Sequence, residues 1–262
     1  MPETPVPPHL LDELAQVASE VAAGAAQILE RYAAGPLAEV GTKSSPTDMV
    51  SEADRASEAY ISATLQQLRP QDSLLGEEGA RRDGTSGVTW VADPLDGTTN
   101  FLYGVPSWAV SLAAEVDGRS VVGVVIDPSR DETWAATLGR GATLNGRPCH
   151  VAEDRAELST ALVATGFGYQ RERRQVQAAV LPRLLPVVRD IRRFGSAALD
   201  LCWVAAGRLD AYFESNLSEW DWAAGRLVCQ EAGGVVTVLA GDTVLATTPR
   251  LLGPLSSLLT GS

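Results

Sequence analysis

The period of the hydrophobic residues changes along the chain, and this change limits the possible folds more than any other feature of the sequence. Apolar residues recur at helical spacing over positions 10–32, which predicts one long amphipathic helix. Ser51-x-x-Asp54 resembles a helix capping box and predicts a second helix that ends at Arg69, before a proline. From Val88 onward the pattern is typical of strands, and in the second half helical and strand patterns alternate.

The order of these segments predicts a layered α/β or α+β fold and excludes a barrel or a pure helical bundle. Asp117-Gly118 and Asn145-Gly146 lie between strand patterns and are typical of hairpin turns. Residues 37–50 and 79–87 are predicted to be loops. We predict strands over residues 88–92, 109–116, 120–126, 132–137, 142–151, 158–165, 209–213 and 235–239. Later helices are predicted over residues 169–190, interrupted by Pro182 and Pro186, and over 196–206 and 221–232.

The length and composition predict one globular domain. A chain of 262 residues can bury a large core, and 45% hydrophobic with 21% charged residues excludes a disordered chain. We expect a mobile proline-rich tail at 1–9 and a single domain over 10–262, with subdomains of about 10–152 and 153–262. No apolar run reaches the roughly 18–20 residues that span a bilayer, so we expect no membrane association. The N-terminus has no signal-peptide pattern.

Charge and the rare reactive residues exclude several functions. With 33 acidic and 21 basic residues the net charge is −12, which disfavours direct binding to nucleic acid. Three cysteines cannot pair completely; Cys202 and Cys229 are predicted to be buried thiols, and we expect a cytoplasmic protein. Two histidines make a Ser-His-Asp triad or a histidine-rich zinc site improbable. Gly166-x-Gly168 is predicted to be a loop, not a dinucleotide site.

Two carboxylates three residues apart give the strongest chemical signal. Asp93 and Asp96 follow an apolar strand, and Pro94 between them keeps the backbone extended, so both side chains can converge. Converging carboxylates repel each other unless a cation lies between them, and oxygen ligands without Cys or His favour Mg²⁺. If Gly97-Thr98-Thr99 opens a helix, its N–H groups can bind a phosphate.

Two further acidic segments are ambiguous by themselves. Glu77-Glu78 lies between glycines, which is typical of a surface turn but also allows a close approach to a metal. Asp221 is predicted to stand where a helix begins, either as an N-cap or as a rigidly placed metal ligand. The arginines between Arg171 and Arg193 predict a solvated helix face, although they could also attract phosphorylated ligands or contact a partner.

The segments KSSPTD, GEEG, DPLDGTTNF, GSAA and WDWAAG, in this order and spacing, resemble the inositol monophosphatase family over about residues 10–250. The resemblance implies a sugar-phosphatase fold, a layered αβαβα sandwich, and a Mg²⁺-dependent, lithium-inhibited phosphatase that works as a homodimer. It is less specific for the substrate, because phosphatases for bisphosphate nucleotides, fructose bisphosphate and histidinol phosphate share these motifs.

The resemblance also assigns residues to roles. One metal would be held by Glu77, Asp93 and the carbonyl of Leu95, and another by Asp93, Asp96 and Asp221, with two or three Mg²⁺ per site. Thr98, with Asp54 behind it, would orient the attacking water, and Glu77 would help to activate it. Lys43 would lie in a mobile loop beside the site. The implied substrate contacts are Asp96, Gly97, Thr98, Gly195, Ser196, Ala197, Glu214 and Asp221.

We therefore expect hydrolysis of inositol 1-phosphate, and of related sugar or polyol phosphates, by direct attack of water. A phosphatase of the same fold for histidinol phosphate or a 3′(2′),5′-bisphosphate nucleotide is the alternative within this class. A non-catalytic regulatory protein associated with an RNA complex is the alternative from another class.

Overall fold

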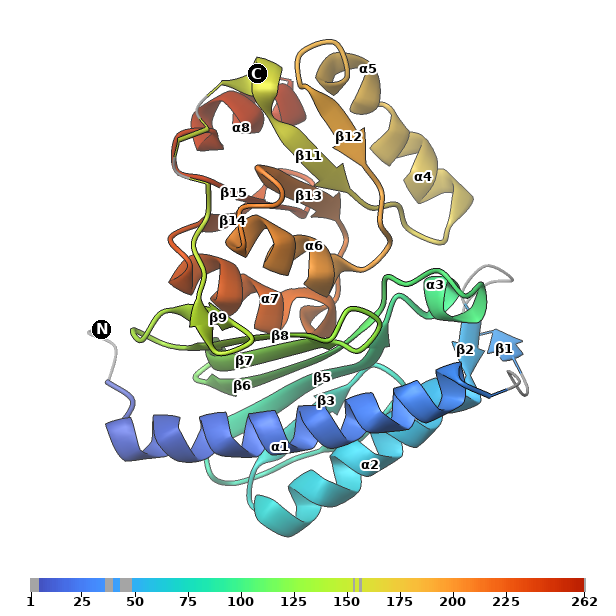
Figure 1. Ribbon diagram of the computed structural model, residues 1–262, viewed down its shortest axis with the longest axis vertical. Helices are drawn as coiled ribbons and strands as arrows, with labels where there is room; N and C mark the ends of the chain where they lie inside the picture. Colours follow the sequence, from blue (N-terminus) through green and yellow to red (C-terminus); the bar gives the residue numbers. More distant parts are fainter. Residues whose placement is uncertain (1–4, 36–39, 43–48, 153, 156, 262) are drawn as a thin grey trace.

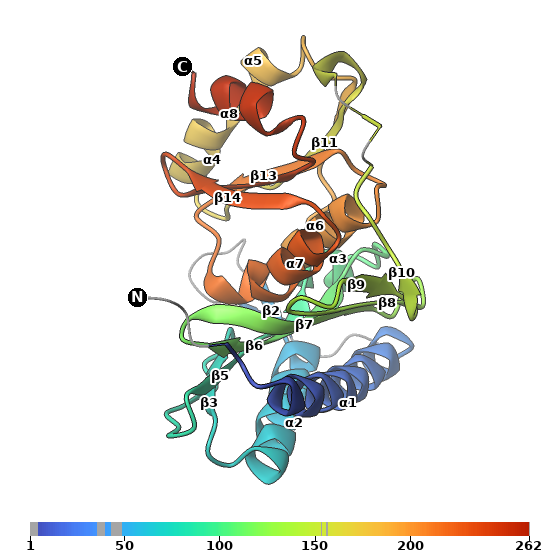
Figure 2. The same ribbon diagram turned by 90° about the vertical axis from the view of Figure 1, so that its left-hand side faces the viewer.

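The computed structural model describes residues 5–35, 40–42, 49–152, 154–155 and 157–261, and its elements form five layers. Figure 1 shows α1 and α2 covering the outer face of one sheet, α6 and α7 between two sheets, and α4, α5 and α8 outside the second sheet. The perpendicular view in Figure 2 shows the same succession. The predicted αβαβα sandwich is confirmed.

The first layer consists of α1 (Pro8–Ala33) and α2 (Glu52–Leu68). Both helices are amphipathic, with their apolar stripes buried against the first sheet. The capping box of α2 is confirmed: the Ser51 backbone N–H donates to Asp54 Oδ2 over 2.8 Å. The tail boundary was wrong by two residues, because α1 already begins at Pro8, whose missing N–H suits the first turn of a helix.

The first large sheet has eight strands in the order β10-β9-β8-β7-β6-β5-β3-β4. Both predicted hairpins are confirmed, with positive φ at Asp117, Gly118, Asn145 and Gly146. The strands are β3 (Ser73–Gly76), β4 (Arg81–Arg82), β5 (Val88–Asp96), β6 (Ala109–Val116), β7 (Arg119–Asp127), β8 (Glu132–Thr137), β9 (Ala142–Leu144) and β10 (Arg147–Pro148). The strand β3 was not predicted, and β4 lies inside a predicted loop.

The second large sheet has five strands in the order β12-β11-β13-β15-β14. β11 (Leu162–Thr165) runs parallel to β12 (Asp190–Arg192) and to β13 (Ala211–Ser215), so the carboxyl ends of all three strands lie at one edge. β14 (Val235–Leu239) and β15 (Thr243–Thr247) complete the sheet in antiparallel order. A separate pair is formed by β1 (Val40–Thr42) and β2 (Met49–Ser51), within and just beyond the predicted loop 37–50.

The helices of the second half connect the two sheets. α6 (Ala197–Ala205) and α7 (Glu219–Glu231) lie between them, and every residue of α6 is buried. Residues of both sheets share one apolar cluster with α6 and α7. The remaining helices are α3 (Thr98–Leu102), the 3₁₀ turn η1 (Leu158–Thr160), α4 (Arg171–Ala178), α5 (Leu181–Leu184) and α8 (Leu252–Thr260).

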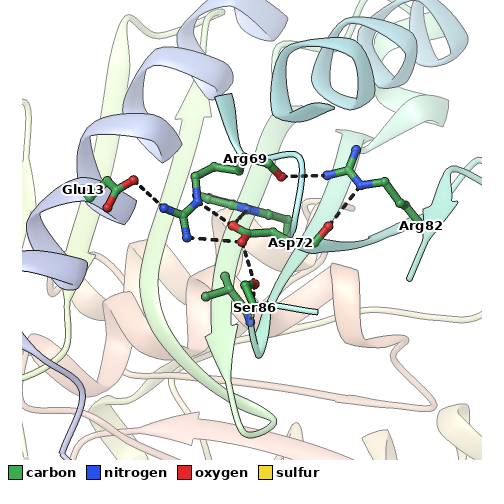
Figure 3. Close-up of polar contacts among 7 residues, drawn as sticks. Glu13, Arg69, Asp72, Arg82 and Ser86 are labelled. Carbon is green, nitrogen blue, oxygen red and sulfur yellow. Dashed lines mark hydrogen bonds and ion pairs between the residues drawn. The ribbon is translucent and has the colours of Figure 1, made fainter. Parts of the chain in front are cut away.

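An ionic network centred on the buried Asp72 lies at the C-terminal end of α2 (Figure 3). Asp72, 1% exposed, accepts hydrogen bonds from Arg69 Nε over 2.7 Å, Ser86 Oγ over 2.6 Å and Trp90 Nε1 over 2.9 Å. Arg69 also pairs with Glu13 of α1. The network therefore ties both outer helices to β5, the strand that carries Asp93 and Asp96.

Candidate active site

The two aspartates of β5 are placed by an irregularity in the strand. The register between β5 and β6 shifts between Asp93 and Asp96, at Pro94, which has no N–H to donate to a neighbouring strand. Asp93 Oδ1 accepts a hydrogen bond from the Leu95 backbone N–H over 3.0 Å. Both aspartates are buried, Asp93 with 2% and Asp96 with 9% exposure, so neither charge is balanced by bulk water.

Asp96 is bound by the start of α6. Its Oδ2 accepts hydrogen bonds from Ser196 Oγ over 2.6 Å and from the Ala198 N–H over 2.7 Å. Ser196 is also the N-cap of α6, so one hydroxyl both begins the helix and holds the carboxylate. Burial, opposed by these hydrogen bonds, raises the pKa of Asp96 to about 7.

Asp221 belongs to α7, but it is not the N-cap. The N-cap is Ser218, whose backbone N–H donates to Asp221 Oδ2 over 2.6 Å, and Asp221 is the third helical residue. The predicted cap was therefore three residues late; the serine three positions before an aspartate is the signal that identifies it. Burial, and next the charge of Asp96, raise the pKa of Asp221 well above its usual value.

Glu77 follows β3 and is half-buried next to these carboxylates. The pKa of Asp93 is raised well above its usual value, first by burial, then by the charges of Glu77 and Asp96 and by a hydrogen bond with Glu77, with a smaller contribution from Asp221. The sequence-predicted Glu77, Asp93, Asp96 and Asp221 are therefore brought together from two β-strand ends and one helix.

Thr98 and Asp54 are in direct contact. Thr98 Oγ1 lies 2.9 Å from Asp54 Oδ1 and 3.1 Å from the carbonyl oxygen of Leu95. The hydroxyl has only one proton to donate. The carboxylate of Asp54 is both the closer and the stronger acceptor, so the hydroxyl donates to Asp54. Burial raises the pKa of Asp54, while its hydrogen bonds with Ser51 and Thr98 act in the opposite direction.

Gly97, before α3, requires glycine for two reasons. Its φ is +94°, in the left-handed region, and a Cβ there would lie 2.8 Å from the carbonyl oxygen of Ser107. The loop is held further by Asn100, whose Nδ2 donates to the carbonyl of Phe194 over 2.6 Å and so joins α3 to the start of α6.

A cavity of about 310 Å³ opens onto the carboxylates at the carboxyl edge of β11, β12 and β13. Of the predicted site residues it is lined by Glu77, Asp96, Gly195, Ala197, Glu214 and Asp221. The predicted Asp54, Asp93, Leu95, Gly97, Thr98 and Ser196 are buried and do not line it. Lys43 lies outside the described residues.

Sequence reasoning missed several residues around this cavity. Arg173 and Arg193 line it, and the predicted helix face is limited to the arginines of α4 and α5, because the stretch continues through a loop and β12. Asp200 in α6 is 1% exposed; burial, and next Glu214 and Asp96, raise its pKa well above the usual value. These positions depend on how the elements pack in three dimensions, and no local sequence pattern indicates that packing.

The donor set fits a hard divalent cation. All of the side chains that could bind a metal here are carboxylates. Burial raises the pKa of Asp93 most, and the repulsion from Glu77 and Asp96 that raises it further is what a cation would relieve. Within the described ranges, no three or more His, Cys, Asp or Glu side chains form a ready-made metal site. Mg²⁺ does not require one, because it keeps several waters and takes one or two carboxylates from a protein.

The comparisons with known proteins agree with this architecture. The model of the inositol monophosphatase family matches residues 10–260, and the chain belongs to that family. Inositol-1-monophosphatase of Mycobacterium leprae is 49% identical over 208 residues, covering 75% of this chain and 70% of that protein.

Two further relatives extend the likeness. The Nus factor SuhB of Escherichia coli is 40% identical over 234 residues, covering 86% of this chain and 87% of that protein. The solved inositol monophosphatase of Anabaena (Nostoc) sp. PCC 7120 superimposes with a TM-score of 0.85 at 36% identity, covering 96% of this chain and 97% of that one.

Proposed function

We propose that this chain is a Mg²⁺-dependent phosphatase that hydrolyses inositol 1-phosphate and related polyol phosphates. One observation supports this most directly: Glu77, Asp96 and Asp221 line a polar cavity of about 310 Å³, and Asp93 is buried next to them. Family membership supports phosphate-ester hydrolysis, since relatives in the family are named inositol-1-monophosphatase.

The metal-binding residues in this proposal are Glu77, Asp93, the carbonyl of Leu95, Asp96 and Asp221. When bound, Mg²⁺ supplies the positive charge that a phosphate dianion requires and makes water a stronger acid. The chain itself holds the carboxylates in place: Ser196 and Ala198 fix Asp96, and the Ser218 N–H fixes Asp221.

Thr98 and Asp54 orient the attacking water in this proposal. Because its O–H donates to Asp54 Oδ1 over 2.9 Å, Thr98 Oγ1 is free to accept a hydrogen bond from water. Two donors from Ser51 hold the other oxygen of Asp54, its backbone N–H at 2.8 Å and its hydroxyl, so the carboxylate cannot turn away. The amides of Gly97 and Thr98 would bind the phosphate, and Gly195, Ser196, Ala197 and Glu214 would bind the alcohol part.

The test is a substrate panel. We expect release of phosphate from myo-inositol 1-phosphate with Mg²⁺, no release with EDTA, and inhibition by Li⁺. Histidinol phosphate and adenosine 3′,5′-bisphosphate are the competing substrates. A preference of tenfold or more in kcat/KM for either would replace the proposed substrate while keeping the reaction class.

A second candidate rests on the relatives that are named Nus factor SuhB, at 38–47% identity. In it the chain is a non-catalytic member of an RNA-associated complex. The net charge of −12 opposes direct contact with RNA. A salt-sensitive RNA mobility shift, together with no phosphatase activity in Mg²⁺, would favour this candidate.

Assembly and location are part of the proposal. Family resemblance supports a homodimer, which sedimentation equilibrium tests. The three cysteines are free and buried, which supports a reducing compartment and hence the cytoplasm. No helix in the part of the chain that the structure describes is long and apolar enough to cross a bilayer.

A further inference from the structure

Glu214 extends toward a neighbouring strand at the rim of the catalytic cavity. It is the fourth residue of β13 and lines the cavity, together with Asp96 and Asp221. The parallel register pairs Thr165 with Phe213, so the next residue of each chain segment, Gly166 and Glu214, are neighbours at the carboxyl edge of the sheet.

Gly166 leaves room that no other residue would leave. An ideal Cβ at Gly166 would lie 1.7 Å from Glu214 Oε2 and 2.2 Å from its carboxyl carbon. Gly166 does not have a positive φ, so its backbone is open to any residue and only the carboxylate requires glycine there. At Gly168, in the same loop, the nearest atom would be 3.5 Å away, an ordinary contact.

Tyr212 holds the same carboxylate through a hydrogen bond. Its hydroxyl donates to Glu214 Oε2 over 2.8 Å, and its side chain is 0% exposed. The ring therefore cannot follow Glu214 if the carboxylate moves. Among the described residues no hydrogen bond is recorded to the other oxygen, Oε1, which leaves it as an acceptor for a ligand.

We propose that Gly166 and Tyr212 are positioning residues that hold the Glu214 carboxylate at the cavity as a hydrogen-bond acceptor for a hydroxyl of the substrate's alcohol part. The inference rests on the proposed function and deepens it, because it assigns the selection of polyol phosphates to one defined contact. It also gives a structural reason for glycine at position 166.

The experiment compares two substrates that differ in the alcohol part. Myo-inositol 1-phosphate carries hydroxyls that can donate hydrogen bonds to Glu214, and the alcohol part of 4-nitrophenyl phosphate carries none. In Gly166→Ala the added methyl displaces the carboxylate, and we expect KM for myo-inositol 1-phosphate to rise about tenfold or more, the usual effect of losing a hydrogen bond to a charged group. KM for 4-nitrophenyl phosphate and both kcat values should change by less than about twofold. The lost hydrogen bond stabilises the bound substrate and the transition state equally, so its loss raises KM without lowering kcat.

Three further variants make the test specific. Gly168→Ala, the matched control, should leave the ratio of the two KM values within about twofold of wild type. Tyr212→Phe should raise that ratio about three- to tenfold, since it removes a single hydroxyl donor. In a Glu214→Ala background, neither Gly166→Ala nor Tyr212→Phe should change the ratio further, because their effects run through the same carboxylate.

The outcomes separate the two claims. An unchanged ratio in Gly166→Ala and Tyr212→Phe, with both substrates still hydrolysed, overturns the positioning role and leaves the proposed function intact. So does a full additional effect in the Glu214→Ala background. No hydrolysis of either substrate by wild type overturns the proposed function and this inference with it. Should Gly166→Ala fail to fold, as thermal melting would show, Tyr212→Phe decides the question by the same ratio.

Discussion

Asp96 shows how a single residue links the two halves of the chain. The residue comes from β5 of the first sheet, and both donors to its Oδ2 come from the start of α6 in the second half. A carboxylate held by two donors is kept in one orientation, although burial raises its pKa to about 7. An ionised carboxylate at this buried position costs stability, and the cation of the proposed function would remove that cost.

Replacing this carboxylate separates activity from folding. We expect Asp96→Asn to reduce kcat/KM for myo-inositol 1-phosphate by about 100-fold or more, the scale of losing one electrostatic group in a transition state. The apo fold should remain intact or become slightly more stable, because an amide removes a charge from the repelling cluster. Steady-state kinetics and thermal melting in EDTA check the two parts, and near wild-type turnover contradicts the assignment.

At the scale of elements, helix starts place the acidic residues. The start of α6 binds Asp96 and the start of α7 binds Asp221, each through backbone N–H groups that a helix leaves unpaired in its first turn. Each of these N–H groups lies at a helix start and also holds a carboxylate of the site. Removing one N–H should therefore alter metal affinity more than fold stability.

Ser218→Pro tests this idea at α7. Proline removes the N–H that donates to Asp221, and the φ of −80° at Ser218 is compatible with a proline ring. We expect the Mg²⁺ concentration for half-maximal activity to rise about tenfold, the effect of one lost charge-assisted hydrogen bond. Ser218→Ala keeps the N–H and should stay within about twofold. Equal Mg²⁺ requirements in both variants contradict the role of the N–H.

The network of Asp72 makes a different element-scale prediction, for stability alone. Asp72→Ala leaves the buried Trp90 Nε1 and Arg69 without their acceptor and should lower the free energy of unfolding by about 3 kcal/mol. Glu13→Ala removes only the exposed partner of Arg69 and should lower it by less than about 1 kcal/mol. Urea denaturation measures both. Similar values for the two variants would show that the buried contacts add nothing.

Some elements could be predicted from sequence because their signals are local. The hairpins at Asp117-Gly118 and Asn145-Gly146 follow from turn residues, and α2 follows from its capping box. The strands β3 and β15 and the helix α8 were missed, because each is short and lacks a long alternating or helical pattern.

The site could be predicted in part for the same physical reason. Asp93 and Asp96 belong to one strand and are three residues apart, so their proximity could be predicted from the sequence. The contact between Gly166 and Glu214 depends on the register of two strands about 50 residues apart, and no local pattern indicates it. The same holds for Arg173 and Arg193, which approach the cavity from different elements.

For the whole molecule, the buried carboxylates couple stability to pH and to metal. Folding raises the pKa of Asp93, Asp96 and Asp221, with Asp96 at about 7 against 3.8 when unfolded. The folded state therefore binds more protons than the unfolded state in this range, and stability falls as pH rises from about 4 to about 7. A bound cation replaces those protons and removes the penalty.

Thermal melting in EDTA should therefore show a Tm that falls from pH 5.5 to pH 7.5, by a few degrees for about one proton. The rise in Tm on adding Mg²⁺ should be larger at pH 7.5 than at pH 5.5. Asp96→Asn should flatten the slope, because it removes the group with a pKa near 7. A metal-free Tm that is constant or rises over this range contradicts the coupling.

The most direct test of the central claim is anomalous diffraction from crystals grown with Mn²⁺, which binds oxygen ligands as Mg²⁺ does. We expect anomalous peaks among the carboxylates of Asp93, Asp96 and Asp221, beside Glu77. Crystals that diffract well but show no peak there, with these side chains turned away from one another, would contradict it.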